Sequence, residues 1–172
     1  MEKQEIIISR DLADSLAQAL DRQSYDRLFV LTDTTTHRLC RPLLSGMKGM
    51  DDARDIVIEP TDEHKDLHSL ASVWTALQEG GATRHSLMIN LGGGMVTDLG
   101  GFAASTFKRG IPYINIPTTL LSMVDASVGG KTGINYGGLK NEIGVFCPAR
   151  TVILSSRFLA SLDSRNLCSG YA

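Results

Sequence analysis

SLMINLGGGMVTDLGGFAASTF, residues 86–107, is the stretch that decides the fold, because it joins three local signals without a break. Residues 86–91 form a mostly apolar run with the length of a buried strand. Three consecutive glycines at 92–94 follow it directly, and residues 95–107 predict a helix. The stretch therefore predicts a strand that passes through a glycine turn into a helix.

The rest of the chain repeats this alternation of apolar strands and helices. Further strands are predicted at residues 5–9, 27–32, 55–59, 111–116 and 151–154, and helices at 11–20, at 67–77, from Thr118-Thr119 onward and from 158–162 onward. This alternation indicates an α/β fold, a Rossmann-like parallel sheet with helices on both faces. Ligands bind such sheets at the carboxyl ends of the strands, where we expect Asp33 and the three glycines to lie.

A phosphate group is the ligand that the glycine turn favours. Backbone amides at a helix N-terminus attract anions, and the missing Cβ atoms permit close approach. The dinucleotide fingerprint GxGxxG is incomplete because Thr97 occupies its third glycine position, so a tight turn without a ligand is the alternative. Asp98 would repel a phosphate directly. We expect it to contact sugar hydroxyls or the far ring of a cofactor instead.

Residues 125–141 show little periodicity and are rich in Gly, Lys and Asn, so they predict a long functional loop. An ATP-type P-loop is excluded there, because Asp125 occupies the first glycine position of that motif. Cations recur at Lys131, at Lys140 and at Lys108-Arg109, a set that suits an anionic substrate. Solvated surface charge is the alternative for each of them.

Composition excludes several classes of protein. The 172 residues, 42% of them apolar and 21% charged, suit one globular domain. A net charge of −2 argues against a nucleic-acid binder. The chain lacks an apolar run of roughly 18 residues and a signal-peptide pattern, so no membrane association is expected. Three scattered cysteines predict no disulfide framework and favour the reducing cytoplasm.

The histidines and cysteines give no pattern of a metal or nucleophile site. His64 and His68 have the spacing of zinc ligands on a helix, but the glutamate of a zincin motif does not accompany them. We interpret them as a surface pair. Cys147 has no histidine near it in the sequence and is not interpreted as a nucleophile.

Five ordered blocks of sequence closely resemble the 3-dehydroquinate synthase family. They are GGGMVTDLGGF at 92–102, FKRG at 107–110, PTTLL at 117–121, VDASVGGKTGIN at 124–135 and KNEIG at 140–144. The strands and helices before them fit the N-terminal NAD-binding domain of that family. The resemblance therefore covers essentially the whole chain, and residues 1–172 are expected to form this one domain.

The resemblance implies a sugar phosphate cyclase, a lyase that converts 3-deoxy-arabino-heptulosonate 7-phosphate to 3-dehydroquinate and phosphate in the shikimate pathway. In the family, NAD transiently oxidises the C5 hydroxyl of the substrate, which acidifies the neighbouring proton. Phosphate is then eliminated, the hydride returns, and an aldol step closes the ring. The cofactor carries the redox chemistry, while the protein supplies orientation and charge.

The resemblance also implies roles for individual residues. Cofactor binding is implied for Asp33, Asp62, Lys65, Gly93, Gly94, Met95, Val96, Thr97, Asp98, Thr118, Thr119, Leu121, Lys131, Lys140 and Ser161. Contact with the reacting groups is implied for Asp125, Lys131, Lys140, Asn141 and Arg109. Asp62 stands where the family usually has Glu, and Ser161 where Thr is usual. Arg109 resembles an arginine that the family supplies across the interface of a homodimer.

The family also uses a divalent metal, zinc or cobalt, held by a glutamate and two histidines. Those ligands are expected beyond Ala172, so this chain is expected to bind no metal and to be inactive alone. Two alternatives stay open. One is a related enzyme, such as an inosose or valiolone synthase or an iron-type alcohol dehydrogenase. The other is a non-catalytic dinucleotide-binding module, for which calorimetry with NAD is the discriminating measurement.

Overall fold

The computed structural model describes residues 4–171 and contains a six-stranded sheet in which every pairing is parallel. The strands are β1 (Glu5–Ile8), β2 (Leu28–Asp33), β3 (Arg54–Ile58), β4 (Leu87–Gly92), β5 (Tyr113–Pro117) and β8 (Thr151–Leu154). Their order across the sheet is β1-β8-β5-β4-β2-β3. The central strand β4 is buried along its whole length, as its apolar run predicts. Residues 1–3 and 172 of the predicted domain lie outside the described part.

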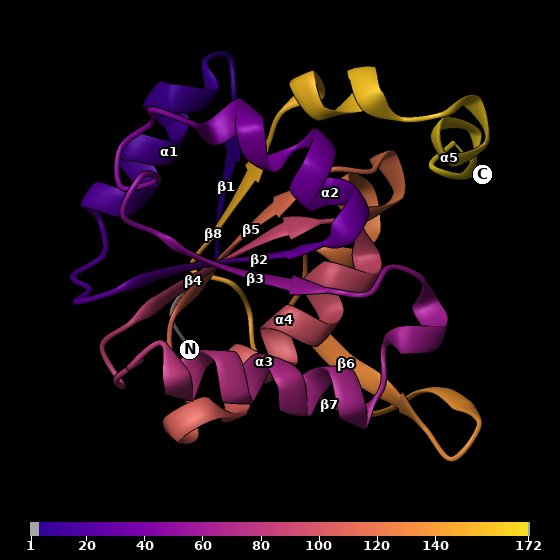
Figure 1. Cartoon of the computed structure of the whole chain (residues 1–172). Helices are drawn as coiled ribbons and strands as arrows, with labels where there is room; N and C mark the ends of the chain where they lie inside the picture. Colours follow the sequence, from indigo (N-terminus) through magenta and orange to yellow (C-terminus); the bar gives the residue numbers. More distant parts are fainter. Residues whose placement is uncertain (1–3, 172) are drawn as a thin grey trace.

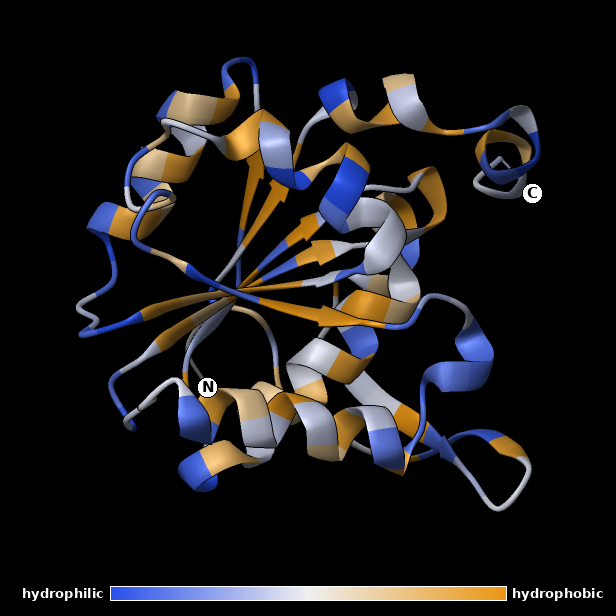
Figure 2. Cartoon of the chain, in the orientation of Figure 1, coloured by the Kyte–Doolittle hydropathy of each residue, from blue (hydrophilic) through white to orange (hydrophobic). Residues whose placement is uncertain are grey.

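Helices cover both faces of this sheet (Figure 1). They are α1 (Leu12–Asp21), α2 (Thr34–Leu39), α3 (Leu67–Glu79) and α4 (Gly94–Thr106), whereas α5 (Ser164–Ser169) lies beyond the carboxyl ends of the strands. One apolar core forms between the sheet and α1, and the other forms between the sheet and the pair α3 and α4. Figure 2 shows the apolar strands enclosed between these layers. The prediction of a Rossmann-like α/β fold is confirmed.

Local capping chemistry explains where several helices begin. Asp11, Asp33 and Asp66 each accept a hydrogen bond from a backbone amide in the first turn of α1, α2 and α3, respectively. Asp33 also forms a capping box with Thr36, at an N–O distance of 2.8 Å. The helix α3 ends at Gly80, where a Cβ atom would lie 2.5 Å from the ring of Phe29. No helix in the described part of the chain is long and apolar enough to span a membrane.

The expected long loop at 125–141 is wrong. Residues Lys131–Tyr136 and Leu139–Phe146 form the antiparallel strands β6 and β7 of a hairpin that packs on the outer side of α4 (Figure 1). Gly137 and Gly138 both have positive φ and make the tight turn between the strands. A Gly-Gly pair is a hairpin signal, but glycines at 133 and 144 interrupt the alternation that identifies strands.

Candidate functional site

The site lies along one edge of the sheet, where the carboxyl ends of five parallel strands meet. In Figure 1 these strands point to the right, toward α2, α4 and the hairpin. The predicted residues follow β2, β3, β4, β5 and β8 at this edge: Asp33; Asp62 and Lys65; Gly93, Gly94 and Asp98; Thr118, Thr119, Leu121 and Asp125; and Ser161. Residues far apart in the sequence are therefore brought to one edge by the parallel topology.

The glycine turn after β4 presents backbone amides rather than side chains. Gly93 is the N-terminal cap of α4, and no side chain of the described residues caps this helix. A Cβ atom on Gly92 would lie 2.6 Å from the Val96 side chain, so the turn can close only with glycine there. A Cβ atom on Gly93 would lie 3.1 Å from the Thr119 side chain, and one on Gly94 would lie 3.3 Å from Ala126, so glycine lets the segment after β5 approach the turn closely. The uncapped N-terminus of α4 suits an anion.

The side chains that follow the glycine turn differ in their burial. Val96 and Thr97 are buried, and Met95 packs against the core. Met95 and Val96 can therefore offer mainly their backbone amides to a ligand, whereas the Thr97 amide donates to the Gly93 carbonyl at 3.0 Å. Asp98, one turn further into α4, directs a partly exposed carboxylate toward the hairpin side of the edge.

A polar cluster forms around Lys65, whose side chain is only 5% exposed. Its Nζ lies 3.0 Å from Asp98 Oδ2 and 3.4 Å from Asp62 Oδ1. It also donates to Asn141 Oδ1 at 2.5 Å. Lys140 forms a second ion pair with Asp62 at 2.9 Å. The α4 turn, the segment after β3 and the hairpin thus share one charge network.

Burial and charge move the two carboxylates of this network in opposite directions. Burial raises the pKa of Asp98 above its ordinary value, and this effect outweighs the attraction of Lys65. The hydrogen bond from Lys140 lowers the pKa of Asp62, with Lys65 adding to the effect. The surroundings therefore favour the protonated form of Asp98 and the ionised form of Asp62.

A cavity of about 530 Å³ adjoins this cluster. Asp98, Asp125, Lys131 and Asn141 line it, together with residues of β6 and β7. Both Asp125 and Lys131 are exposed, and neither forms an ion pair within residues 4–171. The cavity thus presents charges of both signs that a ligand could engage.

Asp125 is carried by a π-helical turn, Ser122–Ala126, that follows β5. The Thr119 hydroxyl lies 2.9 Å from the Ser122 hydroxyl, and Ser127 donates to the Ser122 carbonyl at 2.6 Å. Asn115, which is buried, donates to the Ser127 carbonyl at 3.2 Å. Such π-turns are frequent at functional sites. The sheet therefore fixes the position of Asp125 through buried amide and hydroxyl groups.

Asp33 and Ser161 lie further along the same edge, beside α2. One carboxylate oxygen of Asp33 is used to cap α2. A hydrogen bond with Ser161 lowers the pKa of the neighbouring Cys40 thiol, but burial raises it more. Ser161 therefore lies next to the end of α2. This position is compatible with the prediction that Ser161 and Asp33 bind the same cofactor.

Arg109 does not join this site within one copy of the chain. It follows the far end of α4, which is about 20 Å long at 1.5 Å per residue. Lys108 and Arg109 both have positive φ, with values of 48° and 68°. Lys108 and Arg109 are not among the residues that line the cavity beside Asp98, whereas Lys131 is.

Asn135 was missed by the sequence interpretation as a site residue. Its side chain and backbone contact both Asp62 and Lys65 across the structure. Two of its partners are backbone groups about 70 residues earlier in the chain, so no local pattern identifies this contact.

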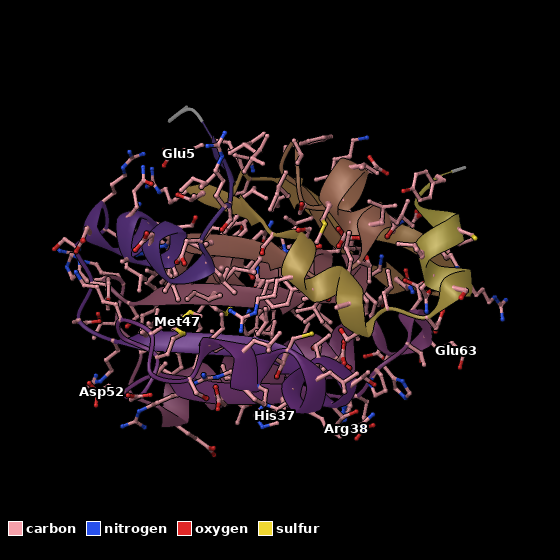
Figure 3. All side chains as sticks on the ribbon, turned by 90° about the horizontal axis from the view of Figure 1, so that it is seen from above. Glu5, His37, Arg38, Met47, Asp52 and Glu63 are labelled. Carbon is pink, nitrogen blue, oxygen red and sulfur yellow. The ribbon has the colours of Figure 1, made fainter. Side chains whose placement is uncertain are left out.

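The site residues fit a dinucleotide but not a metal. The described residues contain no group of three or more His, Cys, Asp or Glu side chains that could hold a metal ion. His37 lies on α2, which follows the carboxyl end of β2 (Figure 3). His85 precedes β4 and therefore lies at the opposite edge of the sheet, where the strands begin. His64 belongs to the 3₁₀ turn Asp62–His64 and His68 to α3, so they share no helix. By contrast, the uncapped helix end at Gly93 suits a pyrophosphate.

A parallel α/β domain with a glycine turn and a charge cluster at its carboxyl edge defines a nucleotide-binding class of fold. The family model "3-dehydroquinate synthase N-terminal" matches residues 55–169. The chain belongs to this family.

Curated relatives support this assignment over the whole chain. A 3-dehydroquinate synthase of Parabacteroides distasonis is 52% identical over 172 residues, which are all of this chain and 49% of the relative. A 3-dehydroquinate synthase of Thermococcus kodakarensis is 42% identical over 91% of this chain and 44% of the relative. The chain thus spans about half the length of these relatives.

Solved structures show the same fold in related enzymes. The 2-epi-5-epi-valiolone synthase of Streptomyces hygroscopicus, described with NAD⁺ and Zn²⁺ bound, is 34% identical with a TM-score of 0.86, over 98% of this chain and 47% of that structure. A 2-deoxy-scyllo-inosose synthase complexed with NAD⁺ and Co²⁺ has a TM-score of 0.84 at 22% identity, over 96% of this chain and 46% of that one. The second likeness concerns the fold alone.

Proposed function

We propose that residues 1–172 are the NAD-binding domain of a 3-dehydroquinate synthase. The observation that carries this proposal is the uncapped N-terminus of α4 at Gly93, which adjoins the cluster of Lys65, Asp98 and Asn141. Membership in the family supports the reaction that the resemblance implies, which we propose for the full-length enzyme: the conversion of 3-deoxy-arabino-heptulosonate 7-phosphate to 3-dehydroquinate and phosphate. Three free cysteines are compatible with the proposed cytoplasmic location.

The geometry supports a division of labour along the edge of the sheet. The amides of Gly93, Gly94 and Met95 face the position that we propose for the pyrophosphate of NAD. Asp33 and Ser161 lie toward the proposed adenosine end. We assign Asp98 and Asp62 as the acceptors for the hydroxyl groups of the sugar, because each carboxylate can accept two or more hydrogen bonds.

The opposite end of the edge is proposed to hold the nicotinamide and the substrate. NAD supplies reversible hydride transfer when it is bound. The exposed Lys131 and Lys140 offer positive charge to an anionic substrate, while Asp125 offers an acceptor to its hydroxyl groups. Asn141 is already oriented by Lys65, so the chain presents this amide in a fixed position.

Two contributions must come from outside one copy of these residues. We propose that Arg109 serves the site of a second copy in a homodimer, because it lies at the far end of α4 from its own glycine turn. We also propose that the zinc or cobalt of the complete enzyme is held by the part of the protein that the longer relatives have and this chain does not cover.

Titration of the 172-residue chain with NAD tests the cofactor site. Amide NMR signals of residues 92–98 are expected to shift on addition of NAD, and calorimetry is expected to show weak binding because the site is open. Inorganic phosphate serves as the control for non-specific anion binding. Shifts confined to surfaces away from the carboxyl edge would contradict the proposal.

A chimera tests the reaction. The chain is joined to the part of the Parabacteroides distasonis relative that it does not cover, and phosphate release from the heptulosonate phosphate is measured. The chimera is expected to release phosphate, whereas the 172-residue chain alone is not. Release by the chain alone would overturn the proposed division of the active site.

A related sugar phosphate cyclase is the second candidate. The 34% identity to the valiolone synthase over 98% of the chain favours it over a simple dehydrogenase. A panel of sedoheptulose 7-phosphate, glucose 6-phosphate and the heptulosonate phosphate, tested on the same chimera, distinguishes the two candidates by the substrate with the largest kcat/KM.

A further inference from the structure

We propose that Asn135 is a positioning residue, which fastens the hairpin to the segment after β3 and so holds Lys65 and Asn141 in their binding geometry. This inference rests on the proposed function, since Lys65 and Asn141 are proposed cofactor and substrate contacts. It goes beyond that function because Asn135 itself needs no contact with either ligand.

Asn135 forms hydrogen bonds with three other residues. Its backbone N–H donates to the Lys65 carbonyl at 2.7 Å. Its side-chain Nδ2 donates to the Asp62 carbonyl at 2.8 Å, and its Oδ1 accepts from the Asn141 backbone amide at 3.0 Å. Lys65 Nζ in turn donates to Asn141 Oδ1. These bonds form a closed ring that joins both arms of the hairpin to the segment after β3.

A bulge in the hairpin makes this arrangement possible. The strand pairing passes from Ile134 opposite Ile143 to Tyr136 opposite Leu139, so Asn135 alone faces residues 140–142. Its backbone N–H is thereby free to bond outside the hairpin. Bulges re-aim side chains beside active sites, and here the bulged arm carries both Lys140 and Asn141. Asn141 also has a positive φ of 53°, which its bond to Asn135 helps to maintain.

The segment that Asn135 holds has a costly backbone conformation. Thr61, directly before Asp62, has φ 86° and ψ 146°. This region is rarely adopted by any residue but glycine, and least by β-branched ones. A segment under such strain relaxes unless its surroundings fix it. The bond from Asn135 to the Asp62 carbonyl lies one residue from the strained position and opposes that relaxation.

The experiment uses the 172-residue chain and two readouts. Asn135→Ala is expected to weaken NAD binding about tenfold, because it removes both side-chain hydrogen bonds that hold the hairpin to the segment after β3. It is also expected to accelerate hydrogen exchange of the Asn141 amide. Asn135→Asp keeps the acceptor for that amide but loses the donor to Asp62. It should therefore weaken NAD binding while leaving the Asn141 amide protected.

A double-mutant cycle separates positioning from direct contact. If Asn135 acts through Lys65 and Asn141, adding Asn135→Ala to the combined variant Lys65→Ala, Asn141→Ala lowers NAD affinity no further. Full additivity of the two losses would overturn the inference. Asn166→Ala, which removes an exposed asparagine of α5 that bonds Asp163, is the matched control and should leave NAD affinity unchanged.

Failure of this inference differs visibly from failure of the proposed function. If the wild-type chain gives no NAD-dependent signal, the proposed cofactor site fails, and the exchange of the Asn141 amide still tests Asn135. If wild type binds NAD and Asn135→Ala binds it equally well with an unchanged Asn141 amide, the positioning role is refuted while the function stands.

Discussion

The strands β4 and β7 both border the site, yet every residue of β4 is buried and every residue of β7 is exposed. The glycine turn is built on β4, so the proposed phosphate position is backed by two apolar cores. Lys140 and Asn141 are carried by β7 and depend on a few polar bonds to keep their place. One half of the site is therefore fixed by packing and the other half by hydrogen bonds.

The largest effect is expected where α4 packs on the sheet. A Cβ atom on Gly100 would lie 2.1 Å from the Asn90 Oδ1 atom and 2.8 Å from the Leu31 side chain. Gly100→Ala should therefore lower the free energy of unfolding by about 3 kcal/mol, despite the better helix propensity of alanine. Urea denaturation followed by the fluorescence of Trp74 measures this loss.

A glycine-to-alanine substitution in the hairpin turn is expected to cost much less. Gly138 has φ 81°, but a Cβ atom there would meet nothing within 4 Å. Gly138→Ala should cost only about 1 kcal/mol from backbone strain. If Gly138→Ala proves as costly as Gly100→Ala, the division between a packed half and a hydrogen-bonded half is untenable.

Sequence patterns predict the packed half well and the other half poorly. The buried strands and the aspartate caps follow from apolar runs and local hydrogen bonding, which short windows of sequence contain. The hairpin was missed because glycines at 133 and 144 replace side chains where alternation would show. The meeting of Lys65, Asp98 and Asn141 was suggested only by the family resemblance, since topology rather than local pattern joins them. The cofactor and substrate roles of these residues stay predictions.

Removing the cation at the centre of the network tests how much that network contributes to stability. Lys65→Ala leaves the largely buried Asp98 carboxylate without its ion-pair partner. We expect a loss of about 2 kcal/mol, less than for a fully buried pair because Asp62 is half-exposed. Lys48→Ala, which breaks an exposed ion pair with Asp21, should cost under about 1 kcal/mol. Equal losses in urea denaturation would show that the network is merely surface charge.

A glycine at the strained position should stabilise the chain. Thr61→Gly removes the cost of φ 86° but gives the unfolded chain more freedom, so a net gain of about 1 kcal/mol is expected. Thr35→Gly, an exposed position in the first turn of α2, should instead destabilise by about 0.5–1 kcal/mol. A loss of stability on Thr61→Gly would mean that the backbone there carries no strain.

The smallest expected effect is the pH dependence that Asp98 contributes. Because burial raises its pKa in the folded state, the folded chain binds this proton more tightly than the unfolded chain does. The contribution of Asp98 to the free energy of unfolding must then decline as the pH rises from its ordinary value near 3.8 through the raised value. Asp98→Asn removes this decline, so the difference in stability between the variant and wild type should change in that pH window and level off above it. If the difference in the free energy of unfolding between Asp98→Asn and wild type is constant with pH, Asp98 has the same pKa in the folded and unfolded states. The network around Lys65 would then be as open to water as the outer strand of the hairpin.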